Sequence, residues 1–264
     1  MANLSMITAA LCPDEVLLRR AAISLAEATV HPTPWVFVID DARSGEQHCV
    51  EALLADALRG SSILPSVYAL PFRATAGGAR SIGLAHVNTR WFGILDADDL
   101  LTPASLDIQL EMLRGNPSAR WCLGAGETLH QDGSRKLWTH GLPAAVPRGY
   151  VARVTKNTGV MPTIPIAAVW EADLIRSLGA WQALPRDEDT SLKLAATTAA
   201  PGVSIALSTY VYRRDLPNQL THAESYGAAG QWCRKAALDR VKALCTSDDL
   251  ADIPDGDWSS FLLS

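Results

Sequence analysis

Short apolar runs alternate with helical patterns along the first hundred residues of the chain. Four of these runs have the length of buried strands: 4–10, 35–39, 66–70 and 91–95. Between them, the spacing of apolar residues indicates three helices: 14–29, 46–59 and 77–87. This rhythm predicts an α/β fold with a Rossmann-like, mostly parallel sheet flanked by helices. Ligands of such sheets bind beyond the carboxyl ends of the strands.

The pattern changes after about residue 119 and predicts a smaller mixed region. Thr102 and Pro103 suit the N-cap and first turn of a helix. Four strands are predicted beyond that helix: 119–125, 166–170, 203–207 and 209–213. A hairpin turn is expected around 131–134, and Pro and Gly residues mark 141–165 as a connecting stretch. Two further helices are predicted, one opening at 187–189 and one at 225–244.

Composition narrows the function classes. The 264 residues are 48% hydrophobic and 19% charged, with a net charge of -5, so the chain lacks the basic excess of a nucleic-acid binder. No apolar run reaches the length of a transmembrane helix, and no basic region precedes the first apolar stretch. Five cysteines without C-x-x-C spacing fit reduced thiols. We therefore expect a cytoplasmic protein without a membrane span or a nucleic-acid partner.

Carboxylates gather where two predicted strands end, at Asp40-Asp41 and at Asp96, Asp98 and Asp99. Three carboxylates within four residues repel one another unless a cation or amide donors offset their charge. One interpretation is a site for Mg²⁺ or Mn²⁺, which take one or two carboxylates together with substrate phosphates. The alternative is one helix-capping carboxylate with solvated neighbours, although Thr102 is the better placed cap.

The surroundings of these carboxylates resemble the family 2 glycosyltransferases of the GT-A fold. Gly78 to Ala85, followed by a short strand and Asp96-Ala97-Asp98-Asp99, is similar to the family string A-R-N-x-G-x-x-x-A, strand, L-D-x-D-D. Three further matches come in the family's order: Val38 to Ser44 for V-D-D-G-S, Glu188-Asp189-x-x-Leu192 for E-D-x-x-L, and Tyr212-Arg213-Arg214 for Y-R-x-H. The resemblance covers roughly residues 4 to 222.

The resemblance implies a role for each matching residue. Asp40 would contact the nucleotide base and Arg80 the nucleotide part of the donor. Asp98 would be the direct metal ligand, with Asp96 nearer the ribose and also a metal ligand. Asp189 would be the catalytic base. The remaining implied substrate-binding residues are Asp99, Glu188, Arg213 and Arg214.

Several positions depart from the family pattern. Thr8 to Pro13 replaces the usual P-x-Y-N, and we expect Thr8 to contact the substrate from there. Ser81 stands where the family has Asn. Asp215 replaces the closing His and could still ligate a metal, but it would repel a diphosphate. Arg213 and Arg214 could bind the diphosphate or form a solvated surface pair.

These observations predict a metal-dependent, inverting glycosyltransferase. Residues 1–222 would be the catalytic domain, with 1–100 binding the nucleotide sugar, 101–222 forming the acceptor side, and 223–264 a helical extension and tail. The expected donor is a UDP-sugar, and the expected acceptor is a diffusible small molecule or saccharide. Trp138 and Trp181 could stack on this acceptor, but core packing is the favoured interpretation for both. The alternatives are a nucleotidyltransferase, which normally carries a Gly-rich basic loop after the first strand, and a non-catalytic sugar-nucleotide-binding scaffold.

Overall fold

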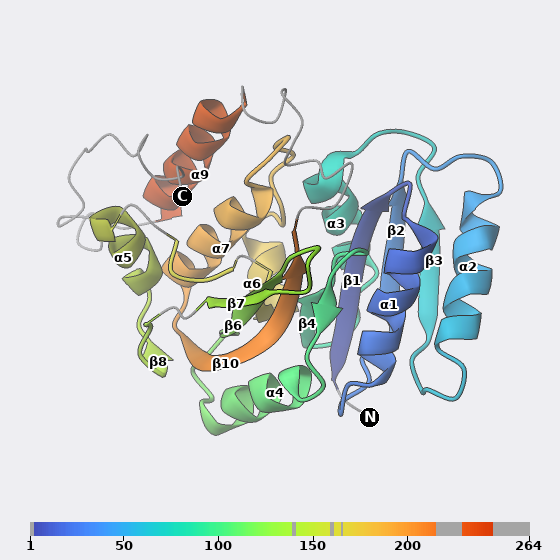
Figure 1. Cartoon of the computed structure of the whole chain (residues 1–264). Coiled ribbons are helices and arrows are strands. Elements are labelled where there is room, and N and C mark those ends of the chain that lie inside the picture. The colour runs from blue at the N-terminus through green and yellow to red at the C-terminus, as the bar shows by residue number, and fades with distance from the viewer. Residues whose placement is uncertain (1–2, 139–140, 159–160, 165, 215–228, 245–264) are drawn as a thin grey trace.

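The computed structural model describes residues 3–138, 141–158, 161–164, 166–214 and 229–244 (Figure 1). The predicted strands and helices of the first hundred residues are present. In chain order they are β1 (Leu4–Leu11), α1 (Glu15–Ala26), β2 (Trp35–Asp40), α2 (Glu46–Ala57), β3 (Pro65–Ala69), α3 (Thr75–Ala85) and β4 (Trp91–Ile94). All residues of β2 and β4 are buried, as expected for strands covered on both faces.

The second half is less regular and contains several short elements. Its elements are β5 (Leu100–Leu101), α4 (Ser105–Gly115), β6 (Trp121–Leu129), β7 (Arg135–Trp138), β8 (Ala145–Val146), α5 (Tyr150–Thr158), β9 (Ala168–Glu171), α6 (Ala172–Ser177), α7 (Glu188–Ala199), β10 (Gly202–Arg213) and α9 (Gly230–Leu244). The hairpin predicted around 131–134 joins β6 to β7.

The strands form one sheet in the order β3-β2-β1-β4-β9-β6-β10-β5, with β7 added to β6 and β8 to β10. The four strands β1 to β4 are mutually parallel, and β6 is parallel to β10. The short strand β9 runs antiparallel to both β4 and β6 and so joins the two parallel blocks. The α/β class and the mostly parallel sheet are therefore confirmed.

Helices cover both sides of this sheet. Helix α1 lies in front of the strands in Figure 1, and α4 packs on β6, β9 and β10. Helix α3 packs on β1 and β2 and also contacts α7. That contact joins the two halves of the sheet at the carboxyl ends of the strands.

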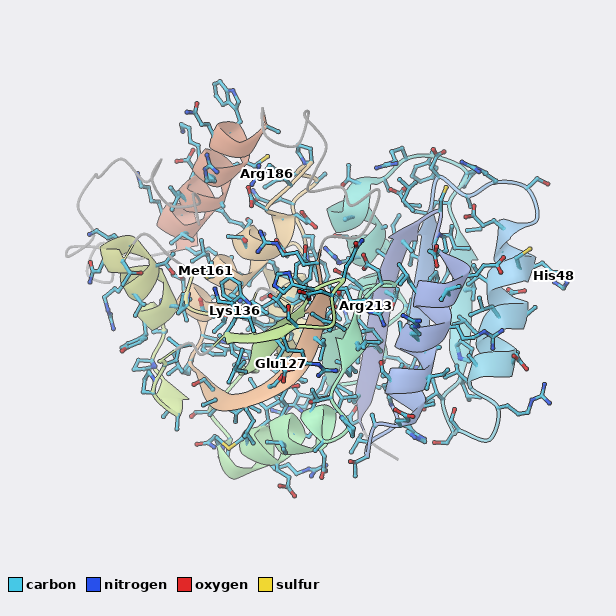
Figure 2. All side chains as sticks on the ribbon, in the orientation of Figure 1. His48, Glu127, Lys136, Met161, Arg186 and Arg213 are labelled. Atoms are coloured by element: carbon cyan, nitrogen blue, oxygen red, sulfur yellow. The ribbon has the colours of Figure 1, made fainter. Side chains whose placement is uncertain are left out.

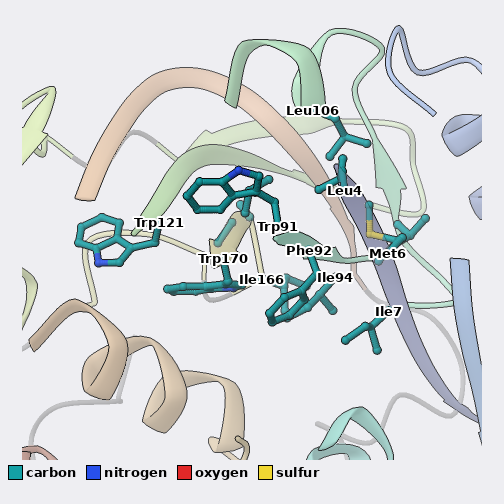
Figure 3. Close-up of a cluster of buried hydrophobic side chains, with 14 of the residues drawn as sticks. Leu4, Met6, Ile7, Trp91, Phe92, Ile94, Leu106, Trp121, Ile166 and Trp170 are labelled. Atoms are coloured by element: carbon teal, nitrogen blue, oxygen red, sulfur yellow. The ribbon is translucent and has the colours of Figure 1, made fainter. Parts of the chain in front are cut away.

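Large aromatic side chains fill the junction between the two halves (Figure 3). Trp121 of β6 lies opposite Trp170 of β9, and both side chains are fully buried. Gly202 lets β10 pass close to Trp121, because a Cβ atom there would overlap the indole ring. Trp181 is also buried. Its ring packs edge-to-face against Phe92, with 6.0 Å between the ring centroids, so Trp181 belongs to the core and is not an exposed acceptor platform.

Some local predictions were wrong. Thr102 does not cap α4: its hydroxyl donates to the Ser208 carbonyl at 2.8 Å, and the N-cap residue is Ala104. The two strands expected at 203–207 and 209–213 are one strand, β10, with register shifts against β6 between 205 and 210. The 141–165 stretch contains α5, whose short amphipathic pattern was hidden among Pro and Gly residues.

Candidate active site

The loop between β4 and β5 carries the three predicted carboxylates, and β10 fixes its shape. The Tyr210 hydroxyl accepts a hydrogen bond from the Asp96 backbone N–H at 3.0 Å and donates one to Asp99 at 2.9 Å. The Arg213 backbone N–H donates to the other Asp99 oxygen at 2.7 Å. Asp99 is 1% exposed. Asp99 therefore braces the loop, and the predicted contact of its side chain with substrate stays a prediction.

Asp98 differs from Asp99 although the two are neighbours in the sequence. Among the described residues, no cationic side chain forms an ion pair with Asp98. Burial and the nearby charge of Asp96 raise the pKa of Asp98 to about 6, against partial opposition from Arg213 and Arg80. Asp98 thus has no cationic partner among the described residues, and it lacks the two hydrogen bonds from β10 that hold Asp99.

Arg80 joins the carboxylate loop to the acceptor-side half. Its guanidinium donates to Asp96 at 2.7 Å and to Glu188, the first residue of α7, at 2.6 Å. Burial alone would lower the pKa of Arg80, but the carboxylates of Asp96, Glu188 and Asp189 raise it overall. Both terminal nitrogens of Arg80 are engaged within the protein, so its contact with a nucleotide stays a prediction.

Gly77 makes this bridge possible because it lets α3 approach the turn before α7. A Cβ atom at Gly77 would lie 2.6 Å from the Gln182 carbonyl oxygen and 3.0 Å from Cγ of Glu188. Any larger residue would therefore push α3 away from α7 and lengthen the Arg80–Glu188 contact.

Glu188 and Asp189 begin α7 and face a largely enclosed region. Burial and the Asp189 charge raise the pKa of Glu188 to about 7, although Arg80 opposes the shift. Burial also raises the pKa of Asp189, against the opposing charge of Arg80. One Asp189 oxygen accepts the Thr190 backbone N–H at 2.6 Å. Asp187, in the left-handed region at φ 59°, creates the sharp turn into the helix and pairs with Arg186 at 2.8 Å.

Asp40 ends β2 at the same edge of the sheet and is 3% exposed. One of its oxygens accepts the Ala74 backbone N–H at 2.6 Å, and the other lies 3.3 Å from Nε of Arg73. These contacts hold the connection into α3. Its predicted contact with a nucleotide base stays a prediction.

Thr8 was predicted to bind substrate, and this stays a prediction, since the structure gives its side chain a role inside the protein. Its side chain is fully buried in β1. The hydroxyl donates to the Leu95 carbonyl at 2.5 Å and accepts from Nε1 of Trp35 at 2.9 Å. Thr8 therefore ties three neighbouring strand segments together inside the core.

The end of β10 places Arg213 beside the carboxylate loop (Figure 2). Its side chain is buried, and the charges of Asp98 and Asp99 act on it. Arg214 is exposed, and its backbone N–H donates to the Leu129 carbonyl at 2.9 Å. Asp215, the third predicted metal ligand, lies outside the described residues.

The sequence interpretation missed Tyr210 and Tyr212, which lie on one face of β10. The side chain of Tyr212 is close enough to Asp99 and Asp98 that their charges, together with burial, raise its pKa to about 12. The signal was present in the sequence: two tyrosines two residues apart, just before Arg213, share one face of a strand.

The donor groups available fit a divalent ion only as part of a larger set. The described residues contain no group of three or more His, Cys, Asp or Glu side chains arranged as metal ligands. Asp96 and Asp98 offer carboxylate oxygens, the ligand type that Mg²⁺ and Mn²⁺ prefer, and such ions complete their coordination with waters and substrate phosphates. The pair therefore suits an ion that arrives with a diphosphate.

The comparisons with known proteins agree with this arrangement. A family model described as "Glycosyl transferase family 2" matches residues 15–139, which include Arg80 and the carboxylate loop. A search of curated proteins found no match. Within the described residues, no helix combines the length and apolarity needed to cross a membrane.

Solved structures of one bacterial protein share the fold. S. aureus TarS 1-349 in complex with UDP-GlcNAc has a TM-score of 0.65 at 12% identity, covering 99% of this chain and 76% of that chain. Its complex with UDP has a TM-score of 0.64 at 14% identity, covering 96% and 75%. A longer TarS structure has a TM-score of 0.62 at 14% identity, and the match spans 45% of its length. At these identities the likeness shows the fold.

Proposed function

We propose that this family 2 glycosyltransferase, whose fold is of the GT-A type, moves a sugar from a UDP-sugar to an acceptor hydroxyl with inversion at the anomeric carbon. The observation that carries the proposal is the Arg80 bridge. Through it, the Asp96–Asp99 loop of the donor side and the Glu188–Asp189 pair of the acceptor side meet at one guanidinium group.

Asp98 and Asp96 would hold a divalent ion together with the donor diphosphate. Such an ion offsets the negative charge that develops on the leaving diphosphate. The low charge compensation around Asp98 supports this assignment, because a raised carboxylate pKa is expected where a cation is missing from its neighbourhood. Tyr210 and Asp99 would keep the loop in the shape that presents Asp98.

Asp189 would act as the general base. The acceptor oxygen forms a bond to the anomeric carbon, the bond from that carbon to the diphosphate oxygen breaks, and the acceptor proton passes to the Asp189 carboxylate. A base is efficient when its pKa lies near the working pH, and burial raises the pKa of Asp189 in that direction. Direct displacement of this kind inverts the anomeric centre.

A saccharide or small natural product would bind on the acceptor side, where Trp138 of β7 is 37% exposed. Its indole N–H donates to Thr128 at 2.6 Å, which fixes the ring. Thr128 pairs with Tyr212 in the sheet, and Tyr212 is close enough to Asp98 that the Asp98 charge helps to raise the pKa of its hydroxyl. The indole N–H therefore reaches β6, the strand that neighbours β10.

Thermal-shift and turnover measurements test the proposal. The melting temperature should rise with UDP and with UDP-GlcNAc, more in the presence of Mn²⁺ than in EDTA, because ligands of the folded state stabilise it by mass action. Slow release of UDP from UDP-GlcNAc should need the metal. Tight nucleotide binding without turnover would favour the non-catalytic scaffold, and the absence of any nucleotide-dependent shift would contradict the proposal.

A further inference from the structure

Lys193 is a fully buried lysine that has no part in the proposed reaction. It lies on α7, one helical turn after Asp189, and its side chain is 0% exposed. Burial lowers the pKa of Lys193 well below its usual range, and the charge of Asp189 only partly opposes this. Burying an amine is unfavourable unless its N–H groups find partners inside the protein, so the partners of Lys193 show what the side chain is held for.

Every hydrogen bond of the Lys193 ammonium goes to one short segment. Its Nζ atom donates to the carbonyl oxygens of Thr163 at 3.0 Å and Ile164 at 2.7 Å, and also to the Thr163 hydroxyl. An ammonium group has three N–H donors, so the segment takes all of them. The sequence here reads Pro162-Thr163-Ile164-Pro165. Two of these four residues lack a backbone N–H, so the segment cannot pair as a regular strand, and Lys193 supplies the donors that its carbonyls need.

The segment held by Lys193 lies on β6 next to the exposed tryptophan. The Ile164 side chain fills the space above Gly126, where a Cβ atom would overlap its Cδ1 atom. Gly126 pairs directly with Trp138 across the β6–β7 hairpin. Ile164 and Trp138 are therefore neighbours on this part of the sheet, and Thr128, which fixes the indole N–H, is two residues further along β6.

We infer that Lys193 is a positioning residue for acceptor binding. Its ammonium group holds the Thr163–Ile164 segment against β6, so that Ile164 and Trp138 together form the apolar wall that receives a saccharide acceptor. The hydrogen bonds of Lys193 link this wall to α7, whose first turn carries Asp189. We call the hydrogen bonds from Lys193 to Thr163 and Ile164 the clamp. The role in acceptor binding rests on the proposed glycosyl transfer, whereas the clamp itself does not.

The clamp is tested first without turnover. Lys193→Met keeps the length and apolar body of the side chain but removes its three donors, and hydrogen–deuterium exchange then reports on peptides covering 161–168. Faster exchange is expected there, with unchanged exchange in β1 and β2. Thr197→Val is the matched control: this buried residue lies one turn further along α7, and its hydroxyl, the group that the substitution removes, bonds within the helix to the carbonyls of Lys193 at 2.8 Å and Leu194 at 3.4 Å.

The consequence for acceptor binding is tested by a split between two KM values. With methyl glycosides as acceptor probes, Lys193→Met should raise the acceptor KM roughly tenfold, whereas the UDP-GlcNAc KM for hydrolysis stays within about twofold of the wild-type value. Thr197→Val should leave both values unchanged. A purely structural defect would move both KM values together.

The clamp, the positioning role and the proposed function are each decided by a different outcome. Wild-type exchange at 161–168 in Lys193→Met would overturn the clamp, and equal shifts of the two KM values would overturn the positioning role. A wild-type protein that neither binds nor hydrolyses UDP-GlcNAc would contradict the proposed function, while the exchange data would still judge the clamp. If Lys193→Met does not fold, Thr163→Val removes one acceptor from the other side of the clamp and should show the same changes at smaller size.

Discussion

The two halves of the sheet, residues 1–100 and 101–222, are stabilised differently; we propose that the first is the donor half and the second the acceptor half. In residues 1–100 the strands β1, β2 and β4 are covered on both sides, and the buried charged residues are Asp40, Arg80 and Asp99. In the described part of 101–222 five charged residues are buried: Glu171, Asp187, Glu188, Lys193 and Arg213. The donor half is thus an apolar scaffold whose few buried charges lie near strand ends and on α3, whereas the acceptor half uses buried charges to hold irregular segments.

This contrast shows where each half can tolerate change. Apolar strands set their own geometry through packing, so the charges at their ends are free to serve a ligand. Buried charges that hold loops are needed for the shape of the site as well as for its chemistry. Substituting a charged residue of the donor half should therefore change activity more than stability, whereas substituting a buried charge of the acceptor half should change both.

The largest effect is expected at Asp98. Asp98→Asn should lower UDP-GlcNAc turnover by about a thousandfold or more, since it removes the proposed ligand of the ion that offsets the leaving-group charge. The same change should raise the melting temperature of the ligand-free protein at neutral pH, because burial and Asp96 disfavour the Asp98 charge. Asp173→Asn is the control, with a side chain 85% exposed. Full activity of Asp98→Asn, or of the wild type in excess EDTA, would remove Asp98 from the mechanism.

Asp189 tests the acceptor half in the same way. Asp189→Asn should reduce kcat for transfer by roughly 10²–10⁴, the usual contribution of a general base. UDP binding, measured by calorimetry, should stay close to the wild-type value because the proposed donor contacts lie in the other half. If kcat is preserved, another group accepts the proton.

Glu188, in the acceptor half, should make the free energy of unfolding depend on pH. Its pKa is raised to about 7 by burial and by Asp189, so the folded state favours the protonated form. The resulting stability is complete below pH 4.5 and is lost as the pH rises through about 7. The difference in unfolding free energy between Glu188→Gln and the wild type should therefore shift in favour of the variant by roughly 2–3 kcal/mol from pH 5 to pH 8. A constant difference across that range would mean that Glu188 titrates normally.

The same contrast explains what could be predicted from the sequence. In the first half the alternation of apolar runs and helical spacing is strong, because each strand is buried on both faces and each helix covers one of them. The positions of β1 to β4 followed from this pattern, and the location of Asp40 and Asp96–Asp99 at one edge followed from the parallel direction of the strands.

The second half resisted prediction because non-local contacts determine it. Helix α5 depends on packing against α7, and the segment around Thr163 depends on a lysine thirty residues later. The scaffold contacts of Thr8 and Asp99 were not foreseen for a related reason. Sequence motifs give the residue type, but only the burial and the hydrogen-bond partners of these two side chains show that they serve the scaffold.

Trp138 should have a moderate effect confined to the acceptor. Trp138→Ala is expected to raise the KM of a methyl glycoside acceptor about tenfold, because it removes a fixed aromatic surface of the proposed wall. Trp232→Ala is a matched control, since this tryptophan on α9 is 76% exposed. A change in donor KM, or equal effects from both tryptophans, would argue against an acceptor platform at Trp138.

Thr8 should have the smallest effect on activity and tests the donor half as a scaffold. Thr8→Val keeps the shape of the side chain but leaves the Leu95 carbonyl and the Trp35 N–H without their hydroxyl partner. The unfolding free energy should fall by about 1–3 kcal/mol, the cost of unsatisfied buried polar groups, while the UDP-GlcNAc KM stays unchanged. Chemical denaturation and hydrolysis kinetics measure the two quantities separately. A raised KM with unchanged stability would return Thr8 to the substrate site, and would show that the apolar half also takes part in recognition.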